Sequence, residues 1–172
     1  RGQRVVLRGK NGSGKSSVLK VICGEPLSYD GILQISRGIK ISYVPQELSF
    51  LRGSLSDYAD KNGLDESLFK AVLRKMDFER VQFEKDMKDF SGGQKKKVLL
   101  ARSLCEQAHL YVWDEPLNFV DLFSRIQMEE LLLEYRPTLL FVEHDEAFRE
   151  RVATRRVSLS ERGLEKTEKD MQ

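Results

Sequence analysis

The sequence predicts an α/β fold: a mainly parallel, doubly wound sheet with a small antiparallel β unit and a helical insert. Short apolar runs of strand length alternate along the chain with segments whose apolar residues recur at helical spacing. Continuous apolar runs are typical of strands covered on both faces, and their alternation with helices is typical of parallel sheets. We expect such strands at residues 5–7, 110–113, 139–142 and 156–159.

Length and composition indicate one domain, residues 1–172, with a substantial core. Basic and acidic residues nearly balance, 29 against 27, so the total charge neither demands nor excludes a nucleic-acid partner. No apolar run reaches the ~18–20 residues of a membrane span, and the isolated Cys23 and Cys105 lack the spacing of a metal site or a disulfide framework. We therefore expect a cytoplasmic domain. Because the chain lacks an initiator Met, we expect it to be part of a longer protein.

A glycine-rich stretch near the start has the G-x-x-x-x-G-K-[ST] spacing of a phosphate-binding loop. The predicted contacts are Gly9, Lys10, Asn11, Gly12, Ser13, Gly14, Lys15, Ser16 and Ser17. Glycines allow a tight turn whose backbone N–H groups face phosphate oxygens. Lys15 can reach the β- and γ-phosphates, and the Ser16 hydroxyl can bind Mg²⁺. A strand before the loop and a helix after it place the predicted fold among the P-loop NTPases.

Two short segments after the first helix alternate apolar and polar residues, as half-buried strands do. They span residues 32–35 and 39–44, with a turn at Gly38 between them. This pattern predicts the small antiparallel unit beside the main sheet. The second segment ends at Pro45, which cannot donate to a β ladder.

Between about residues 49 and 105 apolar residues recur three and four positions apart, with charged residues between them. This spacing predicts amphipathic helices, which we interpret as a helical subdomain. Its last helix begins at Ser91-Gly92-Gly93-Gln94. A later helix is expected from Asp121, as its N-cap, to Tyr135. The charged tail, about residues 161–172, is expected to be frayed.

Two carboxylates, Asp114 and Glu115, follow the strand at residues 110–113. The carboxyl end of a central strand is where a doubly wound sheet binds its ligand. Consecutive side chains that leave a strand diverge. We therefore predict that Asp114 belongs to the Mg²⁺ shell, whereas Glu115 orients or deprotonates water.

Taken in order, these motifs resemble the nucleotide-binding domain of ATP-binding cassette (ABC) proteins over nearly the whole chain. The match comprises the Walker A loop at 9–16, the Q-loop Gln46, the signature at 90–94 with Phe90 in place of Leu, Walker B at 110–114, the catalytic Glu115, the D-loop Asp121 and the switch His144. The resemblance implies ATP and Mg²⁺ as cofactors. It also implies that Gln46 contacts Mg²⁺ and water, that Glu115 is the general base, and that His144 contacts the γ-phosphate.

The resemblance implies that one cassette holds half of a composite site. In ABC proteins the residues matching Ser91, Gly92, Gly93 and Gln94 close over ATP held by a second cassette, in the same chain or in a homodimer. Lys95, Lys96 and Lys97 crowd the start of the signature helix, where exposed cations cost ~0.3–1 kcal/mol each. They either face the partner's triphosphate or form a solvated basic face or nucleic-acid contact. No residue before Gly9 can be assigned to stack on adenine, so we expect this piece alone to hydrolyse ATP weakly.

The sequence E-P-L-N-F-V-D at residues 115–121 resembles the E-P-x-N-x-x-D stretch of the ABC-F subfamily. Transporter cassettes more often carry E-P-x-S-x-L-D. Residues 124–127 and 141–145 look like the antibiotic-resistance ABC-F proteins, which implies the second cassette of a protein that acts on the ribosome and its rRNA. Two alternatives remain: the ATPase subunit of a membrane transporter, with membrane subunits as partners, and a non-hydrolysing dimerisation module. Glu115 and His144 argue against the last.

Overall fold

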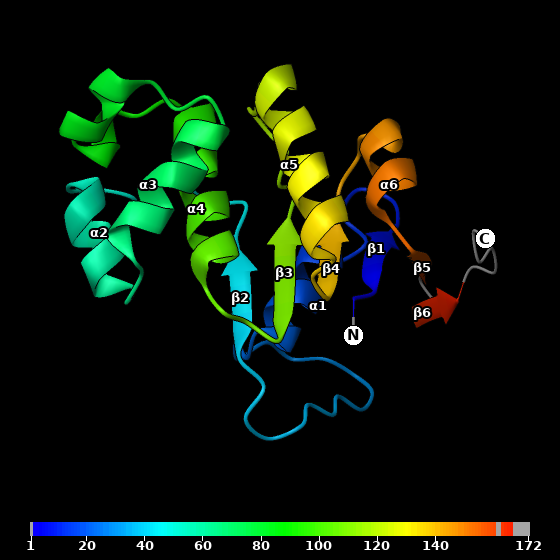
Figure 1. The fold of residues 1–172 in the computed structure, drawn as a ribbon. Coiled ribbons are helices and arrows are strands. Elements are labelled where there is room, and N and C mark those ends of the chain that lie inside the picture. The colour runs from blue at the N-terminus through cyan, green and yellow to red at the C-terminus, as the bar shows by residue number, and fades with distance from the viewer. Residues whose placement is uncertain (1, 161–162, 167–172) are drawn as a thin grey trace.

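A twisted sheet forms the centre of the computed structural model, which describes residues 2–160 and 163–166 (Figure 1). In the described residues it has six strands in the order β2-β3-β4-β1-β5-β6. The strands are β1 (Arg4–Arg8), β2 (Ile41–Val44), β3 (Leu110–Asp114), β4 (Leu139–Val142), β5 (Arg155–Ser160) and β6 (Gly163–Lys166). All neighbouring pairs are parallel except β5 and β6. The predicted mainly parallel α/β sheet is therefore confirmed.

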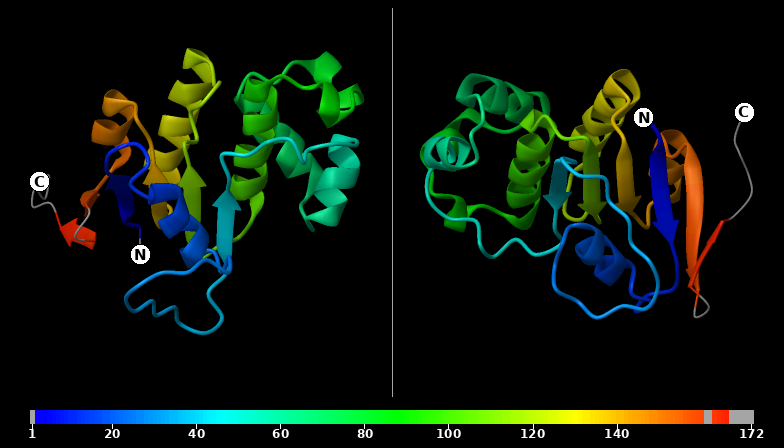
Figure 2. Two further views of the ribbon diagram at one scale, coloured as in Figure 1. Left: turned by 180° about the vertical axis from the view of Figure 1, so that it is seen from behind. Right: turned by 90° about the horizontal axis from the view of Figure 1, so that it is seen from below.

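Helices cover both faces of this sheet, as Figure 2 shows. Helix α1 (Lys15–Ile22) lies on one face, and α4 (Gly92–Cys105), α5 (Leu122–Tyr135) and α6 (Glu146–Val152) lie on the other. Successive strand side chains point to opposite faces. Accordingly, Val112 and Val142 pack with Leu19 of α1 in one core, whereas Trp113 and Phe141 belong to the larger core on the other face.

The segment between β2 and β3 is helical. It contains α2 (Leu55–Lys61), α3 (Glu66–Lys75), the 3₁₀ turns Arg80–Glu84 and Met87–Asp89, and α4. Ser54 and Asp65 cap α2 and α3 by accepting a hydrogen bond from a backbone N–H of the first turn. Helices α2 and α3 form a lobe beside the β2 edge of the sheet (Figure 1). Their status as a separate subdomain, residues 49–105, remains a prediction.

The antiparallel unit predicted at residues 32–44 does not form. Residues 25–40 contain no helix or strand, and Ile32 is 90% exposed. A strand needs a neighbour to receive its hydrogen bonds and cover its apolar side. No described strand lies beside residues 32–35. The second segment instead supplies β2, which pairs parallel with β3.

The antiparallel pair lies at the opposite edge of the sheet, between β5 and β6. Residues 163–166, part of the tail expected to be frayed, form β6 because their backbone completes the edge of β5. The rest of the predicted tail, 161–162 and 167–172, lies outside the described residues. Across the part of the chain with described structure, every helix is too short or too polar to cross a membrane.

Candidate functional site

The phosphate-binding loop joins β1 to α1 and depends on three glycines. Gly12 and Gly14 have φ of 77° and 92°, the left-handed region that glycine enters without strain. A Cβ on Gly9 would lie 2.9 Å from the carbonyl oxygen of Leu159. Lys15 Nζ donates to the carbonyl oxygens of Gly9 and Lys10, at 3.0 and 2.9 Å. The lysine thus lies folded over the loop, where a phosphate oxygen could replace either carbonyl.

Ser16 at the end of this loop contacts Asp114 at the end of β3. The Ser16 hydroxyl donates a hydrogen bond to the Asp114 carboxylate, and Asp114 is buried. Burial raises the pKa of Asp114, the Ser16 hydrogen bond opposes this, and the charge of Glu115 adds to it. Two buried oxygens near the loop, Ser13 Oγ and Asp114 Oδ1, lack a hydrogen-bond partner among the described residues. Oxygen donors with unused capacity fit a phosphate with a hard cation such as Mg²⁺.

No group of three or more His, Cys, Asp and Glu side chains that could hold an ion occurs in the described residues. Mg²⁺ usually takes only one or two carboxylates and completes its shell with water and substrate phosphates. The pair of Ser16 and Asp114 therefore suits a cation that arrives with a triphosphate.

Three predicted catalytic residues come together where β2, β3 and β4 end. Gln46 Nε2 donates to Glu115 Oε2 at 2.9 Å, and His144 Nε2 lies 3.1 Å from Glu115 Oε1. We call Gln46, Glu115 and His144 the strand-end cluster. Glu115 has φ of 49°, a left-handed conformation that is uncommon outside glycine and concentrates at functional sites.

Two further residues hold this cluster, and sequence reasoning gave neither a structural role. Asn118 Nδ2 also donates to Glu115 Oε2. The buried carboxylate of Glu143 accepts hydrogen bonds from the backbone N–H groups of Leu117 and His144, which joins the turn after Glu115 to the segment that carries His144. The signal that could have found Glu143 is an acid directly after a buried strand, the pattern that marked Asp114.

The signature residues form a second region, away from the phosphate-binding loop. Ser91 and Gln94 make a reciprocal capping box: Ser91 Oγ accepts from the Gln94 N–H at 3.2 Å, and Gln94 Oε1 accepts from the Ser91 N–H at 2.9 Å. Gly93 packs so tightly that an added Cβ would lie 2.3 Å from the carbonyl oxygen of Phe119. Asp121 is the predicted N-cap of α5 and accepts from the Ser124 N–H at 2.9 Å.

Ser91, Gly93, Gln94, Phe119 and Asp121 line a cavity of about 270 Å³, which we call the signature pocket. None of the phosphate-binding residues 9–17 lines it. The structure therefore separates the predicted nucleotide contacts into two regions: residues 9–17 with the strand-end cluster, and the signature pocket.

The lysines of the signature helix correct the sequence interpretation. Lys96 is fully buried, and its Nζ donates to the carbonyl oxygens of Pro45 at 3.1 Å and Asp114 at 3.4 Å. Lys97 pairs with Asp121 at 2.7 Å. Long lysine stems can pack in a core while the ammonium reaches oxygen acceptors. Lys96 thus forms neither a solvated face nor a surface open to a partner's triphosphate. Lys97 lines the signature pocket with its ammonium paired to Asp121, and Lys95 remains partly exposed.

These contacts shift the pKa values of two groups. Burial lowers the pKa of Lys96, whereas the carboxylates of Asp114, Glu115 and Glu143 oppose that shift. Burial alone would raise the pKa of Asp121, but hydrogen bonds from Lys97 and Ser124 outweigh it and hold the pKa well below its usual range.

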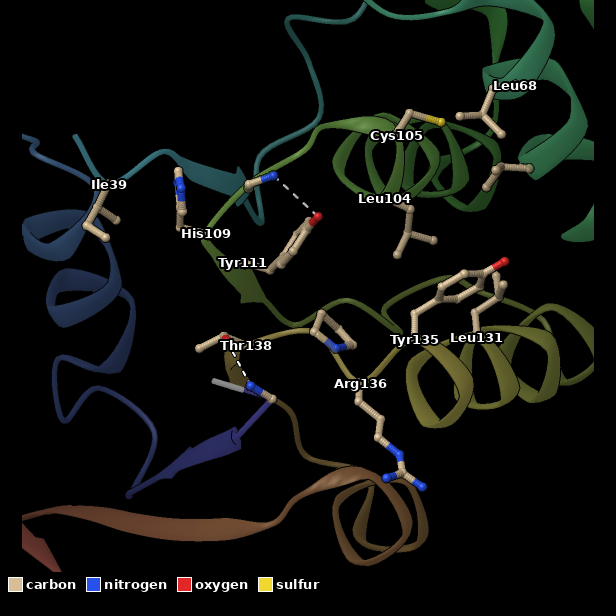
Figure 3. Close-up of a pocket in the computed structure, with 14 residues that line it drawn as sticks. Ile39, Leu68, Leu104, Cys105, His109, Tyr111, Leu131, Tyr135, Arg136 and Thr138 are labelled. Atoms are coloured by element: carbon tan, nitrogen blue, oxygen red, sulfur yellow. Dashed lines mark hydrogen bonds between the residues drawn. The ribbon is translucent and has the colours of Figure 1, made fainter.

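A larger cavity, about 680 Å³, lies at the other end of the sheet (Figure 3). Residues at or just before the starts of β1 to β4 line it, including Gly2, Tyr111 and Thr138, together with apolar side chains such as Leu104 and Leu131. Thr138 Oγ1 accepts the Gly2 N–H, so this polar group is satisfied. The cavity contains none of the predicted site residues. Volume alone therefore does not identify the predicted nucleotide site.

Known proteins have sequences similar to this one. A model of the family described as ABC transporter matches residues 1–118. ATP-binding protein Uup of Caulobacter vibrioides is 34% identical over 167 residues, covering 96% of this chain and 27% of that protein. Ribosome protection protein VmlR of Bacillus subtilis is 32% identical over 176 residues, covering 99% of this chain and 31% of that protein. The chain thus spans about a quarter to a third of these relatives.

The fold is also shared with solved structures. The complex of archaeal ribosomal stalk protein aP1 with the archaeal ribosome recycling factor aABCE1 matches with a TM-score of 0.76 and 22% identity, over 92% of this chain and 32% of that one. The family model covers more than half of the chain, and it includes the phosphate-binding loop, the signature and the Asp114-Glu115 pair. The chain belongs to the ABC transporter family, as an ATPase cassette similar to the ABC-F type.

Proposed function

We propose that this chain is one ATP-hydrolysing cassette of an ABC-F protein, which pairs with a second cassette around ATP and acts on the ribosome in translation or antibiotic resistance. The strand-end cluster is the observation that carries hydrolysis: a carboxylate held by an amide and an imidazole beside a phosphate-binding loop. The ribosomal part rests on the relative named for ribosome protection, and on the Asn118 stretch.

Binding comes first, through residues 9–17. The loop N–H groups and the N-terminus of α1, which has no acid in its first turn, receive the β- and γ-phosphates. Lys15 exchanges its carbonyl partners for phosphate oxygens. Ser16, Asp114 and Gln46 would hold Mg²⁺, which, when bound, neutralises charge on the β- and γ-oxygens.

Hydrolysis then depends on Glu115, which takes a proton from the attacking water. Gln46 orients that water, and His144 and Lys15 offset the negative charge that develops on the γ-phosphate oxygens. Both oxygens of Glu115 have partners in the structure, from Gln46, Asn118 and His144. These three hydrogen bonds use two acceptor positions on Oε2 and one on Oε1, so Oε1 keeps one position for the attacking water.

The signature pocket supports the pairing of two cassettes. It presents the N-terminus of α4, and the exposed ring of Phe119 lies beside it. Since no residue of the chain's own phosphate-binding loop lines it, we assign it to the nucleotide held by the second cassette. Each site is then completed only when two cassettes meet.

The test uses Glu115→Gln in the protein as the cell makes it, because the amide keeps the size of the side chain but cannot act as a base. We expect ATP to stay bound, paired cassettes to accumulate, and the variant to sediment with ribosomes when ATP is present. Lys15→Ala, which cannot hold the phosphates, is the control and should remain unbound. Sedimentation with membranes through a membrane subunit, and not with ribosomes, would support the transporter alternative and overturn the ribosomal assignment.

A further inference from the structure

The buried ammonium of Lys96 joins the ends of two strands that carry the strand-end cluster. Its Nζ donates to the carbonyl oxygen of Pro45 at 3.1 Å and to that of Asp114 at 3.4 Å. Pro45 directly precedes Gln46, and Asp114 directly precedes Glu115. Lys96 thus contacts the backbone one residue before each member of the hydrogen-bonded pair Gln46–Glu115.

The backbone cannot make this connection by itself. The β2–β3 ladder ends with Val44 beside Trp113. The residue after β2 is Pro45, which has no N–H to extend the ladder. A lysine ammonium has three donors and can serve two carbonyl oxygens at once. Lys96 therefore supplies a connection between the strands at the point where the ladder stops.

We propose that Lys96 is a positioning residue for ATP hydrolysis: it fixes the spacing between Gln46 and Glu115 and ties that spacing to the signature helix α4. The inference rests on the proposed roles of Gln46 and Glu115. Lys96 lies one turn into α4, whose N-terminus carries Ser91 and Gly93. A displacement of this helix therefore acts directly on the backbone of both catalytic strands.

The alternative is that a buried lysine only stabilises the fold. The chain contains a matched contact that separates the two roles. Ser103 lies two helical turns further along α4, also fully buried, and its Oγ bonds Ser42 of β2 at 2.7 Å and accepts from Trp113 Nε1 of β3 at 2.9 Å. Ser103 therefore joins the same helix to the same two strands, but away from Gln46 and Glu115.

Lys96→Met and Ser103→Ala test the proposal by steady-state ATP hydrolysis in the protein as the cell makes it. Lys96→Met keeps an unbranched side chain of similar volume and removes the donors. We expect kcat to fall about ten- to hundredfold with the KM for ATP nearly unchanged, because misplacing catalytic groups by about 1 Å costs on this scale. Ser103→Ala should lower the melting temperature but leave kcat within about twofold.

A kcat of Lys96→Met within about twofold of the unaltered protein would overturn the proposal, and so would an equal loss of kcat in Ser103→Ala. If Lys96→Met does not fold, Lys96→Gln decides the question. Its amide is one atom shorter and cannot reach both carbonyl oxygens, so kcat should still fall, and an unchanged kcat would overturn the proposal. Glu115→Gln is measured alongside: full activity there refutes the proposed base, whereas its loss together with an active Lys96→Met refutes only the role of Lys96.

Discussion

The strand-end cluster and the signature pocket are built by different kinds of contact. Side chains from three strand ends form the cluster, and its hydrogen bonds join residues to which we assign catalytic roles. In the signature pocket, Gly93 packs against the backbone carbonyl of Phe119, and an ion pair between Lys97 and Asp121 joins α4 to the start of α5. Substitutions in the cluster should therefore change the reaction without changing the fold, whereas substitutions at the pocket should change packing first.

The largest expected effect is on chemistry at the cluster. Glu115→Gln should lower kcat by about 10²–10⁴-fold, the range for losing a general base, with no change in melting temperature. Single-turnover phosphate release measures the step directly. Glu134→Gln, an exposed acid on α5, is the matched control and should behave as the unaltered protein. A large drop in the melting temperature of Glu115→Gln would mean that the cluster also stabilises the fold. It would contradict the distinction between the strand-end cluster and the signature pocket.

Neighbouring glycines of the signature test the packing at the pocket. Gly93→Ala places a Cβ 2.3 Å from the Phe119 carbonyl oxygen, so the backbone must shift, and we expect a loss of about 1–3 kcal/mol in the free energy of unfolding. Gly92→Ala meets only the exposed Phe119 ring, at 3.3 Å, which can turn away. Denaturant unfolding of the two variants measures the difference. Equal stability would show that the close approach is not a constraint.

The smallest expected effect concerns the ion pair of Lys97 and Asp121. Asp121→Asn keeps an oxygen to cap α5 but loses the charge, and because Asp121 is 48% exposed, solvent limits the cost to less than about 1 kcal/mol. The pKa of Asp121 is lowered in the folded state. Its contribution is therefore present above the unfolded-state pKa of about 3.9 and fades as the pH falls below it. Melting curves should differ near neutral pH and converge in acid; a constant difference would contradict the ion pair as the cause.

The positions of the catalytic candidates at strand ends were predictable because the order of the motifs agrees with the topology of the sheet. Each predicted catalytic residue follows an apolar run, and parallel strands bring their carboxyl ends to one edge. That reasoning correctly placed Gln46, Glu115 and His144 at neighbouring strand ends. It could not specify that Asn118 also bonds Glu115, since that contact depends on how the chain turns after β3.

The errors share a physical cause: each depended on neighbours that a local pattern does not contain. Three consecutive lysines look solvated. Lys96 is nevertheless buried, because two carbonyl oxygens beyond the β2–β3 ladder accept hydrogen bonds from its Nζ. Residues 32–35 alternate like a strand, but no described strand lies beside them. Conversely, residues 163–166 look like part of a charged tail but form a strand that pairs antiparallel with β5.

Pro45 has a consequence for how molecules of this protein behave toward one another. Among the described strands, β2 forms one edge of the sheet, and it is only four residues long. An exposed edge offers free N–H and C=O groups to strands of other chains, and short edges that stop at a proline offer fewer of them. The carbonyl oxygen of Pro45 is already bonded to Lys96. The residue that ends the ladder beside the strand-end cluster thus also limits edge-to-edge association in a crowded solution.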